Sequence, residues 1–386
     1  MGEEKGKPAY VSRLHLKNWQ NFREVDVALQ RRCFLVGPNA SGKSNLLGSL
    51  RFLHDLTAVG GGLQEAVSRR HGVSALRCLA ARKYSDIEIQ ADLRNEQIDT
   101  VWQYHLVFTQ DNRRRPIIRK EVVSRDGDVL LTRPDPDDDA DPERLTQTYL
   151  EQVNANRAFR EVAEFFSSVR YLHLVPQLVR EPDRSVGRVR DPYGGDFLEQ
   201  LAAAPEKTRS ARLRKIREAL KVAVPQLSEL ELSRDARGTP HLRGRYEHWR
   251  PQGAWQQEDQ FSDGTLRLLG LLWSLLDGGG PLLLEEPELS LHPEVVKVIP
   301  RMFQRVQQKA HRQVLVSTHS DDLLADEGIG LDEVILLEPS PEGTKARSAA
   351  GLADVEALLS GGVSLGEAVL PKTRPGSVAQ LALFDR

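Results

Sequence analysis

The segment from residue 33 to residue 55 constrains the fold most strongly, because a glycine-rich loop there joins a short apolar run to an amphipathic stretch. The loop matches the pattern G-x-x-x-x-G-K-[ST] at every fixed position. Glycines allow such a loop to curl so that successive backbone N–H groups face a phosphate, and the N-terminus of the following helix adds a partial positive charge. The residues that we expect to bind phosphate are Gly37, Pro38, Asn39, Ala40, Ser41, Gly42, Lys43, Ser44 and Asn45.

Two side chains of this loop have specific predicted roles. We expect Lys43 to reach the β- and γ-phosphates of a nucleotide and to act in catalysis, and we expect the Ser44 hydroxyl to coordinate Mg²⁺. ATP and Mg²⁺ are therefore the predicted cofactors. The alternative is a chance glycine-rich turn, which the apolar strand before the loop and the amphipathic helix after it disfavour.

A second apolar run, residues 281–284, ends in the carboxylates Glu285, Glu286 and, after a proline, Glu288. In open α/β sheets, ligands bind at the carboxyl ends of the strands. One carboxylate there can hold Mg²⁺ or its water, and another can orient and deprotonate an attacking water. We assign Glu285 to the metal and Glu286 to the water, as the catalytic base. The alternative is an exposed acidic turn.

A third apolar run, residues 314–316, is followed by Ser-Thr-His-Ser, which ends at residue 320. A histidine at the end of such a strand can hydrogen-bond a γ-phosphate and report its presence. Among the ten histidines of the chain, His319 is therefore the predicted catalytic one, and His292 is the second choice.

The apolar pattern also predicts the fold class. From residue 262 onward, stretches in which apolar residues have helical spacing alternate with short apolar runs. We expect helices over 265–277 and 293–308 and strands over 281–285, 313–317 and 333–338. This alternation indicates a parallel sheet with crossover helices, whereas residues 86–132 alternate as antiparallel strands do. The predicted class is α/β, with a mixed or parallel central sheet, an antiparallel β subdomain and a helical insertion.

Residues 134–168 combine an acidic stretch with a helical apolar pattern. The stretch PDPDDDADP at 134–142 resembles a calcium loop in composition only, because it lacks the central Gly and the closing bidentate Glu, so we expect a solvated loop. The apolar positions between 143 and 168 are spaced for a helical face.

Composition excludes several classes of protein. The 386 residues carry a net charge of −2, which gives no overall attraction to nucleic acid. No apolar run approaches the roughly 20 residues that span a bilayer, and the first residues have no apolar signal region. Cys33 and Cys78, the only cysteines, provide neither a disulfide framework nor a zinc site. We therefore expect a cytoplasmic protein without membrane contact.

Together these motifs resemble the ABC-class ATPases of the RecF, SMC and OLD group, and most of all its compact AAA_21-type members. Leu14–Phe22 is similar to the first strand and turn of that group, FSDGT at 261–265 to its signature segment, and EEPELSLHP at 285–293 to its Walker B motif and D-loop. His319 takes the place of its switch histidine. The resemblance spans about residues 1–60 and 255–340. Glu285 stands where most of the wider class has Asp, and FSDGT differs from the signature of transporters, which argues against a transporter subunit.

The resemblance implies an ABC-type ATPase head that forms a homodimer around two ATP molecules. Ser262 and Gly264 of one protomer would cap the nucleotide on the phosphate loop of the other, and Ser262 lies at a predicted helix N-terminus, which suits an anion. Gln177 is the best match to the glutamine loop that contacts nucleotide and metal; an ordinary polar loop residue is the alternative. The implied organisation is an N-terminal ATPase lobe (1–80), a β and helical insertion (81–255), a C-terminal ATPase lobe (256–345), and a helix with a flexible tail (346–386).

Two functions fit this resemblance. The first is a nucleotide-dependent, DNA-associated switch in DNA repair or anti-phage defence, with a separate effector or nuclease subunit. The second is a regulatory scaffold that controls a partner effector protein without contacting nucleic acid. Basic clusters at 113–115, 180–190 and 209–217 fit either double-stranded DNA or solvated faces with internal ion pairs. Gln380–Phe384 resembles the peptide by which bacterial DNA-processing proteins dock on the sliding clamp; packing on the chain's own core or on another partner is the alternative.

Overall fold

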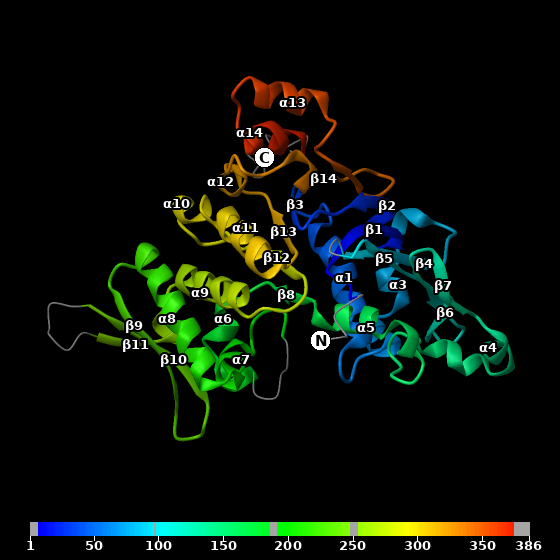
Figure 1. The fold of residues 1–386 in the computed structure, drawn as a ribbon, viewed down its shortest axis with the longest axis horizontal. Coiled ribbons are helices and arrows are strands. Elements are labelled where there is room, and N and C mark those ends of the chain that lie inside the picture. Colours follow the sequence, from blue (N-terminus) through cyan, green and yellow to red (C-terminus); the bar gives the residue numbers. More distant parts are fainter. Residues whose placement is uncertain (1–6, 96–97, 186–190, 248–253, 374–386) are drawn as a thin grey trace, which may run out of the picture. The chain divides into compact units, whose positions relative to one another are not determined.

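The computed structural model describes residues 7–95, 98–185, 191–247 and 254–373. The chain forms two compact units (Figure 1). The first comprises Met1–Arg170, Gly279–Leu283 and Gln304–Arg386, and the second comprises Tyr171–Gly278 and Leu284–Phe303. The peptide Gln380–Phe384, predicted to dock on a sliding clamp, lies outside the described residues. None of the helices in the described ranges is both long and apolar enough to cross a membrane.

An antiparallel sheet of six strands forms one layer of the first unit, in the order β2-β1-β4-β5-β6-β7. Its strands are β1 (Tyr10–Trp19), β2 (Phe22–Ala28), β4 (Ile87–Asn95), β5 (Thr100–Gln110), β6 (Pro116–Arg125) and β7 (Asp128–Arg133). Alternate residues of β5, from Trp102 to Phe108, are fully buried, because successive side chains of a strand point to opposite faces. The antiparallel region predicted for residues 86–132 is confirmed.

A second sheet of six strands has the order β15-β14-β3-β13-β12-β8. Its strands are β3 (Arg32–Val36), β8 (Arg170–Leu172), β12 (Leu282–Glu285), β13 (Val314–Thr318), β14 (Val334–Glu338) and β15 (Lys345–Ser348). Strands β13 and β14 run parallel to β3, and β15 runs antiparallel to β14. Residues 33–36 of β3 are fully buried, as expected for a central strand of a parallel sheet. The predicted mixed α/β fold is confirmed.

Helix α1 (Lys43–Thr57) connects the two sheets of the first unit through its apolar side. The predicted face of Leu46, Leu47, Leu50 and Leu53 is fully buried. Phe52 of α1 contacts Trp19 and Phe108 of the antiparallel sheet, with ring centroids 5.4 Å apart in both pairs. The other helices of this unit are α2 (Leu63–Ser68), α3 (Val73–Leu76), α4 (Pro136–Ala140), α5 (Arg160–Ser168), most of α11 (Ile299–Ala310), α12 (Asp321–Leu324), α13 (Ala353–Ser360) and α14 (Leu365–Val369).

In its described residues, the second unit packs five helices and a small sheet around one apolar core. Its elements are α6 (Pro176–Val179), α7 (Phe197–Ala203), α8 (Glu206–Ala223), β9 (Leu227–Arg234), β10 (Pro240–Tyr246), β11 (Ala254–Gln257), α9 (Asp263–Leu276) and α10 (Pro293–Val296). Leu213, Ile216 and Leu220 of α8 face this core together with Leu266 and Leu269 of α9. Helices α7 and α8 form the helical insertion that the sequence predicts, and the three-stranded sheet β11-β10-β9 was not predicted.

Two expectations for residues 134–168 need correction. Most of the acidic stretch is exposed, as expected, but it is not a loop throughout: it contains helix α4, whose N-cap Asp135 forms a capping box with Asp138, and Asp138 is buried. The helical face predicted from residue 143 forms only from residue 160, where α5 begins; the residues before it form turns and short 3₁₀ helices. A network of buried ion pairs holds the acidic stretch against the antiparallel sheet.

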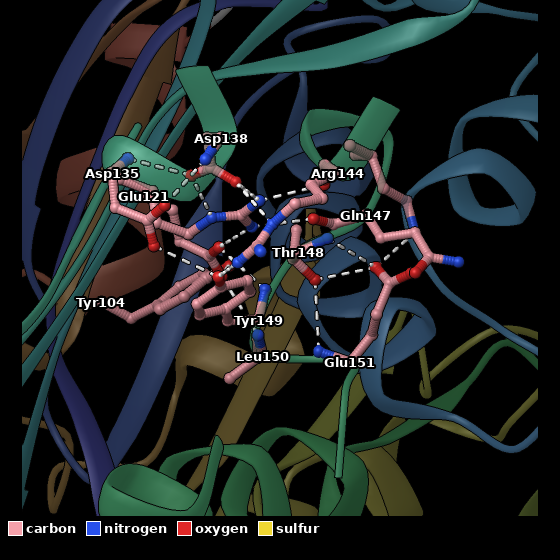
Figure 2. A network of polar contacts seen from close by, with 12 residues as sticks. Tyr104, Glu121, Asp135, Asp138, Arg144, Gln147, Thr148, Tyr149, Leu150 and Glu151 are labelled. Atoms are coloured by element: carbon pink, nitrogen blue, oxygen red, sulfur yellow. Dashed lines mark hydrogen bonds and ion pairs between the residues drawn. The ribbon is translucent and has the colours of Figure 1, made fainter. Parts of the chain in front are cut away.

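Arg133 lies at the centre of this network and is fully buried. Its guanidinium donates two hydrogen bonds to Asp138 (2.8 and 2.9 Å) and one to Glu121 (3.1 Å). Its two remaining N–H groups donate to the carbonyl oxygens of Gln147 and Arg144, so all of its donors are satisfied. Figure 2 labels the residues that provide these acceptors, Asp138, Glu121, Gln147 and Arg144. A buried charge survives only with such complete pairing, and this pairing folds the acidic stretch against the sheet.

Glu121 is the second fully buried charge of the network. Besides Arg133, its carboxylate accepts hydrogen bonds from the Tyr104 hydroxyl (3.1 Å) and from the backbone N–H groups of Tyr149 (2.8 Å) and Leu150 (3.1 Å) (Figure 2). Burial raises the pKa of this carboxyl, and the backbone and Arg133 hydrogen bonds oppose that shift. Glu121, which lies in strand β6, therefore binds the turn at residues 149–150 to that strand by hydrogen bonds.

Candidate functional site

The phosphate loop follows β3 and leads into α1. Gly42 is the N-cap residue of α1 and has φ +95°, and Ala40 has φ +62°, so the chain passes twice through the left-handed region. A Cβ added at Gly37 would lie 2.5 Å from Ser41 Oγ and 2.8 Å from the Leu337 carbonyl oxygen. Glycine therefore stands where the tight turn leaves no room for a side chain.

The side chains of the loop fit a phosphate group. Lys43 is 6% exposed, and its Nζ donates hydrogen bonds to the carbonyl oxygens of Gly37 (2.9 Å) and Pro38 (3.2 Å). The buried Ser41 Oγ has no hydrogen-bond partner among the described residues. Within α1, no side chain caps the N-terminus and no acidic residue lies in the first turn. Three features suit the phosphates of a nucleotide: the Lys43 ammonium beside the loop carbonyls, the unsatisfied Ser41 hydroxyl and the uncapped N-terminus of α1. The exposed Ser44 hydroxyl suits the accompanying Mg²⁺.

His319 lies at the same edge of the sheet as this loop. Strand β13 runs parallel to β3, with Thr318 opposite Val36. The next residue of β3 is Gly37, and the next residue of β13 is His319, so both leave the sheet side by side. The His319 side chain is exposed. Of the predicted site residues in the first unit, the structure thus brings the loop residues and His319 together.

The signature segment lies in the second unit, at the start of α9. Ser262 is the N-cap residue, and its Oγ accepts a hydrogen bond from the Thr265 backbone N–H (3.2 Å) and contacts the Thr265 hydroxyl (2.8 Å). A Cβ added at Gly264 would lie 2.5 Å from the Ser290 carbonyl oxygen. A glycine is therefore needed at position 264, because the backbone at Ser290 packs so closely that there is no room for a Cβ.

The predicted carboxylates Glu285 and Glu286 are half-buried at the end of β12. The Tyr171 hydroxyl donates a hydrogen bond to Glu285. Glu286 has φ +43°, a strained conformation for a residue with a Cβ, and such strain clusters at functional sites. Burial lowers the pKa of the Arg267 guanidinium, and the negative charges of Asp263 and Glu286 oppose this shift. Glu286 thus lies within the electrostatic field of an arginine from the signature helix.

Gln177 and His292 have less distinctive surroundings. Gln177 is exposed on the short helix α6, in the same unit as the signature segment, and its predicted role in nucleotide and metal binding stays a prediction. His292 is the N-cap residue of α10, and its Nδ1 accepts a hydrogen bond from the Glu294 backbone N–H (3.2 Å). This contact gives His292 a structural role as a helix cap.

Three side chains that contact predicted site residues were not identified from the sequence. Asn21 bonds to the phosphate loop, Tyr171 bonds to Glu285, and Arg180 donates to the Phe261 carbonyl oxygen (2.7 Å) and to Asp263 (2.5 Å). Asn21 lies in the segment that resembles the first turn of the RecF, SMC and OLD group, which was the one available signal. Tyr171 and Arg180 are distant in sequence from the residues they contact, and no local motif marks them.

Comparisons with known proteins identify a family and a fold. A family profile described as "AAA domain, putative AbiEii toxin, Type IV TA system" (AAA_21) matches residues 33–326. None of the curated proteins matches the sequence. Among solved structures, an SMC head bound to the C-winged helix domain of ScpA aligns with 90% of this chain and 99% of its own, with a TM-score of 0.55 and 14% identity. An SMC head domain with an extended coiled coil, bound to the C-terminal domain of ScpA derived from Pyrococcus furiosus, aligns with 91% of this chain and 99% of its own (TM-score 0.54, 13% identity).

Proposed function

Since this chain belongs to the AAA_21 family of ATPase domains and has the fold of an SMC head domain, we propose that it binds ATP on Gly37–Asn45 and hydrolyses it to ADP and phosphate. The observation that carries this proposal is the uncapped N-terminus of α1 beside the unsatisfied Ser41 hydroxyl and the buried Lys43 ammonium. The helix N-terminus and the Ser41 hydroxyl are costly to leave without a ligand, and a phosphate satisfies both. Lys43, bonded to the Gly37 and Pro38 carbonyl oxygens, adds a positive charge beside them.

Each predicted residue has a separate task in this proposal. Lys43 and the loop N–H groups hold the phosphates, and Ser44 and Glu285 hold Mg²⁺, which neutralises charge on the phosphate oxygens when bound. Glu286 accepts the proton of the attacking water, and His319 hydrogen-bonds the terminal phosphate. The Tyr171 hydrogen bond fixes the direction of the Glu285 carboxylate, which supports a metal ligand at that position.

A homodimer would complete the site. In this proposal Ser262 and Gly264 of a second copy cap the nucleotide that Lys43 and Ser44 hold, and hydrolysis releases the two copies. Ser262 is the N-cap residue of the 14-residue helix α9; its hydroxyl accepts the Thr265 N–H and Asp263 lies in the first turn, so its accessibility, rather than the helix N-terminus, supports this role. The Ser262 side chain is exposed, as a group that meets another molecule must be.

We propose further that the ATPase acts as a DNA-associated switch in DNA repair or anti-phage defence, together with a separate effector or nuclease subunit. Helix α8 supports DNA contact, since it carries seven Lys or Arg residues and two Glu. Arg209 and Arg212 bond within the second unit. The basic side chains of α8 that are exposed are Lys207, Arg214, Lys215 and Lys221.

The alternative proposal is a regulatory scaffold that controls a partner protein without contacting nucleic acid. It is supported by the SMC heads of similar fold that were solved with a domain of ScpA bound. The toxin system named in the family description supports a role in defence under either proposal. The two proposals differ in whether DNA changes the rate of hydrolysis.

The test measures ATP hydrolysis by the wild type and by Glu286→Gln, with and without double-stranded DNA, at about 50 and 200 mM salt. We expect Glu286→Gln to lower kcat by about 10²- to 10⁴-fold while ATP binding and ATP-dependent dimerisation persist. Lys43→Ala serves as the control that loses binding. Undiminished hydrolysis by Glu286→Gln would refute its assignment as the base.

The DNA arms of the same experiment separate the two proposals. Stimulation by DNA that weakens at the higher salt concentration favours the DNA-associated switch, because phosphate contacts release counterions. An unchanged rate with DNA, together with intact ATP-dependent dimerisation, favours the scaffold. If the wild type neither binds nor hydrolyses ATP, both proposals fail.

A further inference from the structure

Asn21, in the turn between β1 and β2, contacts the phosphate loop at two points. Its Nδ2 donates a hydrogen bond to the Ser41 carbonyl oxygen (3.0 Å), and its Oδ1 accepts one from Asn45 Nδ2 (2.8 Å). Ser41 and Asn45 lie on either side of the junction between the loop and α1. One side chain therefore bonds to both sides of the point at which the phosphate loop becomes a helix.

The missing side chain of Gly42 makes room for this contact. A Cβ added at Gly42 would lie 2.2 Å from Asn21 Nδ2 and 2.5 Å from its Oδ1. The carboxamide of Asn21 thus packs directly on the left-handed N-cap residue of α1. From the same hairpin, the Trp19 indole N–H donates a hydrogen bond to the backbone carbonyl oxygen of Asn45 (2.8 Å). The hairpin therefore bonds to the first turn of α1 through a second side chain.

Asn21 is also bonded to a segment more than 300 residues away in the chain, the turn between β14 and β15. The Asn21 Nδ2 donates a hydrogen bond to the Thr344 hydroxyl (2.6 Å). The backbone carbonyl oxygen of Asn21 accepts a hydrogen bond from the Thr344 backbone N–H (2.8 Å). Thr344 is 5% exposed. A Cβ added at Gly343 would lie 2.8 Å from the Asn21 carbonyl oxygen, so the two turns are in close contact.

We propose that Asn21 is a positioning residue for the phosphate loop and that it couples this loop to the β14–β15 turn. The inference rests on the proposed function, because it concerns the groups that would hold the nucleotide. Loop N–H groups bind phosphate only when their directions are fixed, and supporting hydrogen bonds provide that fixation. Removing the carboxamide leaves the Ser41 carbonyl, the Asn45 amide and the Thr344 hydroxyl without this partner, so the loop loses its side-chain hydrogen bonds to the β1–β2 turn.

Asn18, three residues earlier, provides a matched control. Its Nδ2 donates to the carbonyl oxygens of Tyr84 (3.0 Å) and Asp86 (2.9 Å), and its Oδ1 accepts from the Cys78 backbone N–H (2.9 Å). Asn18 therefore makes as many hydrogen bonds as Asn21 from the same hairpin, but all of them lead to residues 78–86. A purely structural role for both residues predicts the same outcome for their replacement by alanine.

The first measurement is ADP affinity by calorimetry in the presence of Mg²⁺, with thermal unfolding of each variant alongside. We expect Asn21→Ala to weaken ADP binding by about tenfold or more, Thr344→Val by a smaller factor, and Asn18→Ala not to weaken it. Asn21→Ser, which retains one hydrogen-bonding group, should recover part of the loss. Wild-type affinity in Asn21→Ala, or an equal loss in Asn18→Ala, would overturn the proposal.

A second measurement, hydrogen exchange without nucleotide, judges the proposal independently of ATP binding. We expect Asn21→Ala and Thr344→Val to accelerate exchange in residues 38–50, and Asn18→Ala to accelerate it in residues 78–86 instead. Unchanged exchange of residues 38–50 in Asn21→Ala would overturn the positioning role. A wild type that does not bind ADP would refute the proposed function, while the exchange data would still decide whether Asn21 holds the loop.

Discussion

Two acidic segments of the chain have similar compositions and different surroundings. In residues 135–141, Asp138 is buried against the guanidinium of Arg133, and Asp135 caps the helix that carries it. In residues 285–288, Glu285 bonds to the neutral hydroxyl of Tyr171, which orients the carboxylate without cancelling its charge. The difference teaches that the partner of a carboxylate, rather than the number of neighbouring acids, indicates whether it stabilises the fold or is available for chemistry.

The largest expected effect tests the structural side of this comparison. Asp138→Asn removes one of the two carboxylates that pair with the buried Arg133 charge and leaves it with Glu121 alone, so we expect the free energy of unfolding to fall by about 3 kcal/mol. Glu286→Gln, an equally conservative change in the other segment, should leave the free energy of unfolding close to that of the wild type. Urea unfolding of both variants measures the contrast. Equal destabilisation by Glu286→Gln would mean that both segments are structural.

The next effect concerns the hydroxyl that orients Glu285. Tyr171→Phe removes that hydrogen bond, and we expect the Mg²⁺ concentration for half-maximal ATP hydrolysis to rise by about tenfold, because partners of metal ligands typically contribute 10- to 100-fold in affinity. Tyr149→Phe is the control from the acidic network, since the Tyr149 hydroxyl donates to Asp135 (3.2 Å). The control should lose stability and keep its Mg²⁺ dependence. If Tyr149→Phe raised the Mg²⁺ requirement and Tyr171→Phe did not, the assignment of Glu285 to the metal would be contradicted.

A smaller effect tests whether the acidic stretch needs its helix cap. The Asp135 carboxylate accepts a hydrogen bond from the Asp138 backbone N–H (2.9 Å), and loss of such a cap costs about 1 kcal/mol. We therefore expect Asp135→Ala to lower the free energy of unfolding by about that amount. Asp139→Ala, at an exposed position of the same helix, should change it by less than about 0.5 kcal/mol. Equal losses in the two variants would show that the cap formed by Asp135 is not the main contribution of its carboxylate.

The smallest effect is a dependence of stability on pH. Burial alone would raise the pKa of the Asp138 carboxyl, but the hydrogen bonds from Arg133 and from the Asp135 backbone outweigh it, so the pKa is lowered from 3.8. A lowered pKa means that the ionised form stabilises the fold: its contribution is present above pH 3.8 and is lost as the pH falls through the lower folded-state value. The unfolding temperature of the wild type should therefore fall more steeply below pH 3.8 than that of Asp138→Asn. Parallel curves would show that Asp138 does not titrate with folding.

The sequence predicts those parts of the fold and site that depend on residues close together in the chain. The phosphate loop needs only one strand, one turn and one helix in succession, and α1 buries the leucines that its pattern indicated. Helix α4 was mistaken for a loop although its signal is local: Asp135 caps the helix, a proline follows it, and Asp138 closes the capping box. Asn21 was missed for a different reason, since its partners Ser41 and Thr344 are 20 and 323 residues away. Pairings over such distances leave no local pattern.

The two cysteines offer a practical consequence of the central position of β3. Cys33 lies within that strand with no exposed surface, and Cys78 is 5% exposed. Burial raises the pKa of the Cys33 thiol, so it remains protonated, and a protonated, inaccessible thiol does not react with alkylating dyes. Because both cysteines are buried, we expect the wild-type protein to incorporate almost no thiol-reactive dye. A single cysteine introduced on an exposed surface would carry a donor or acceptor dye, and energy transfer between two labelled copies would follow their association in real time.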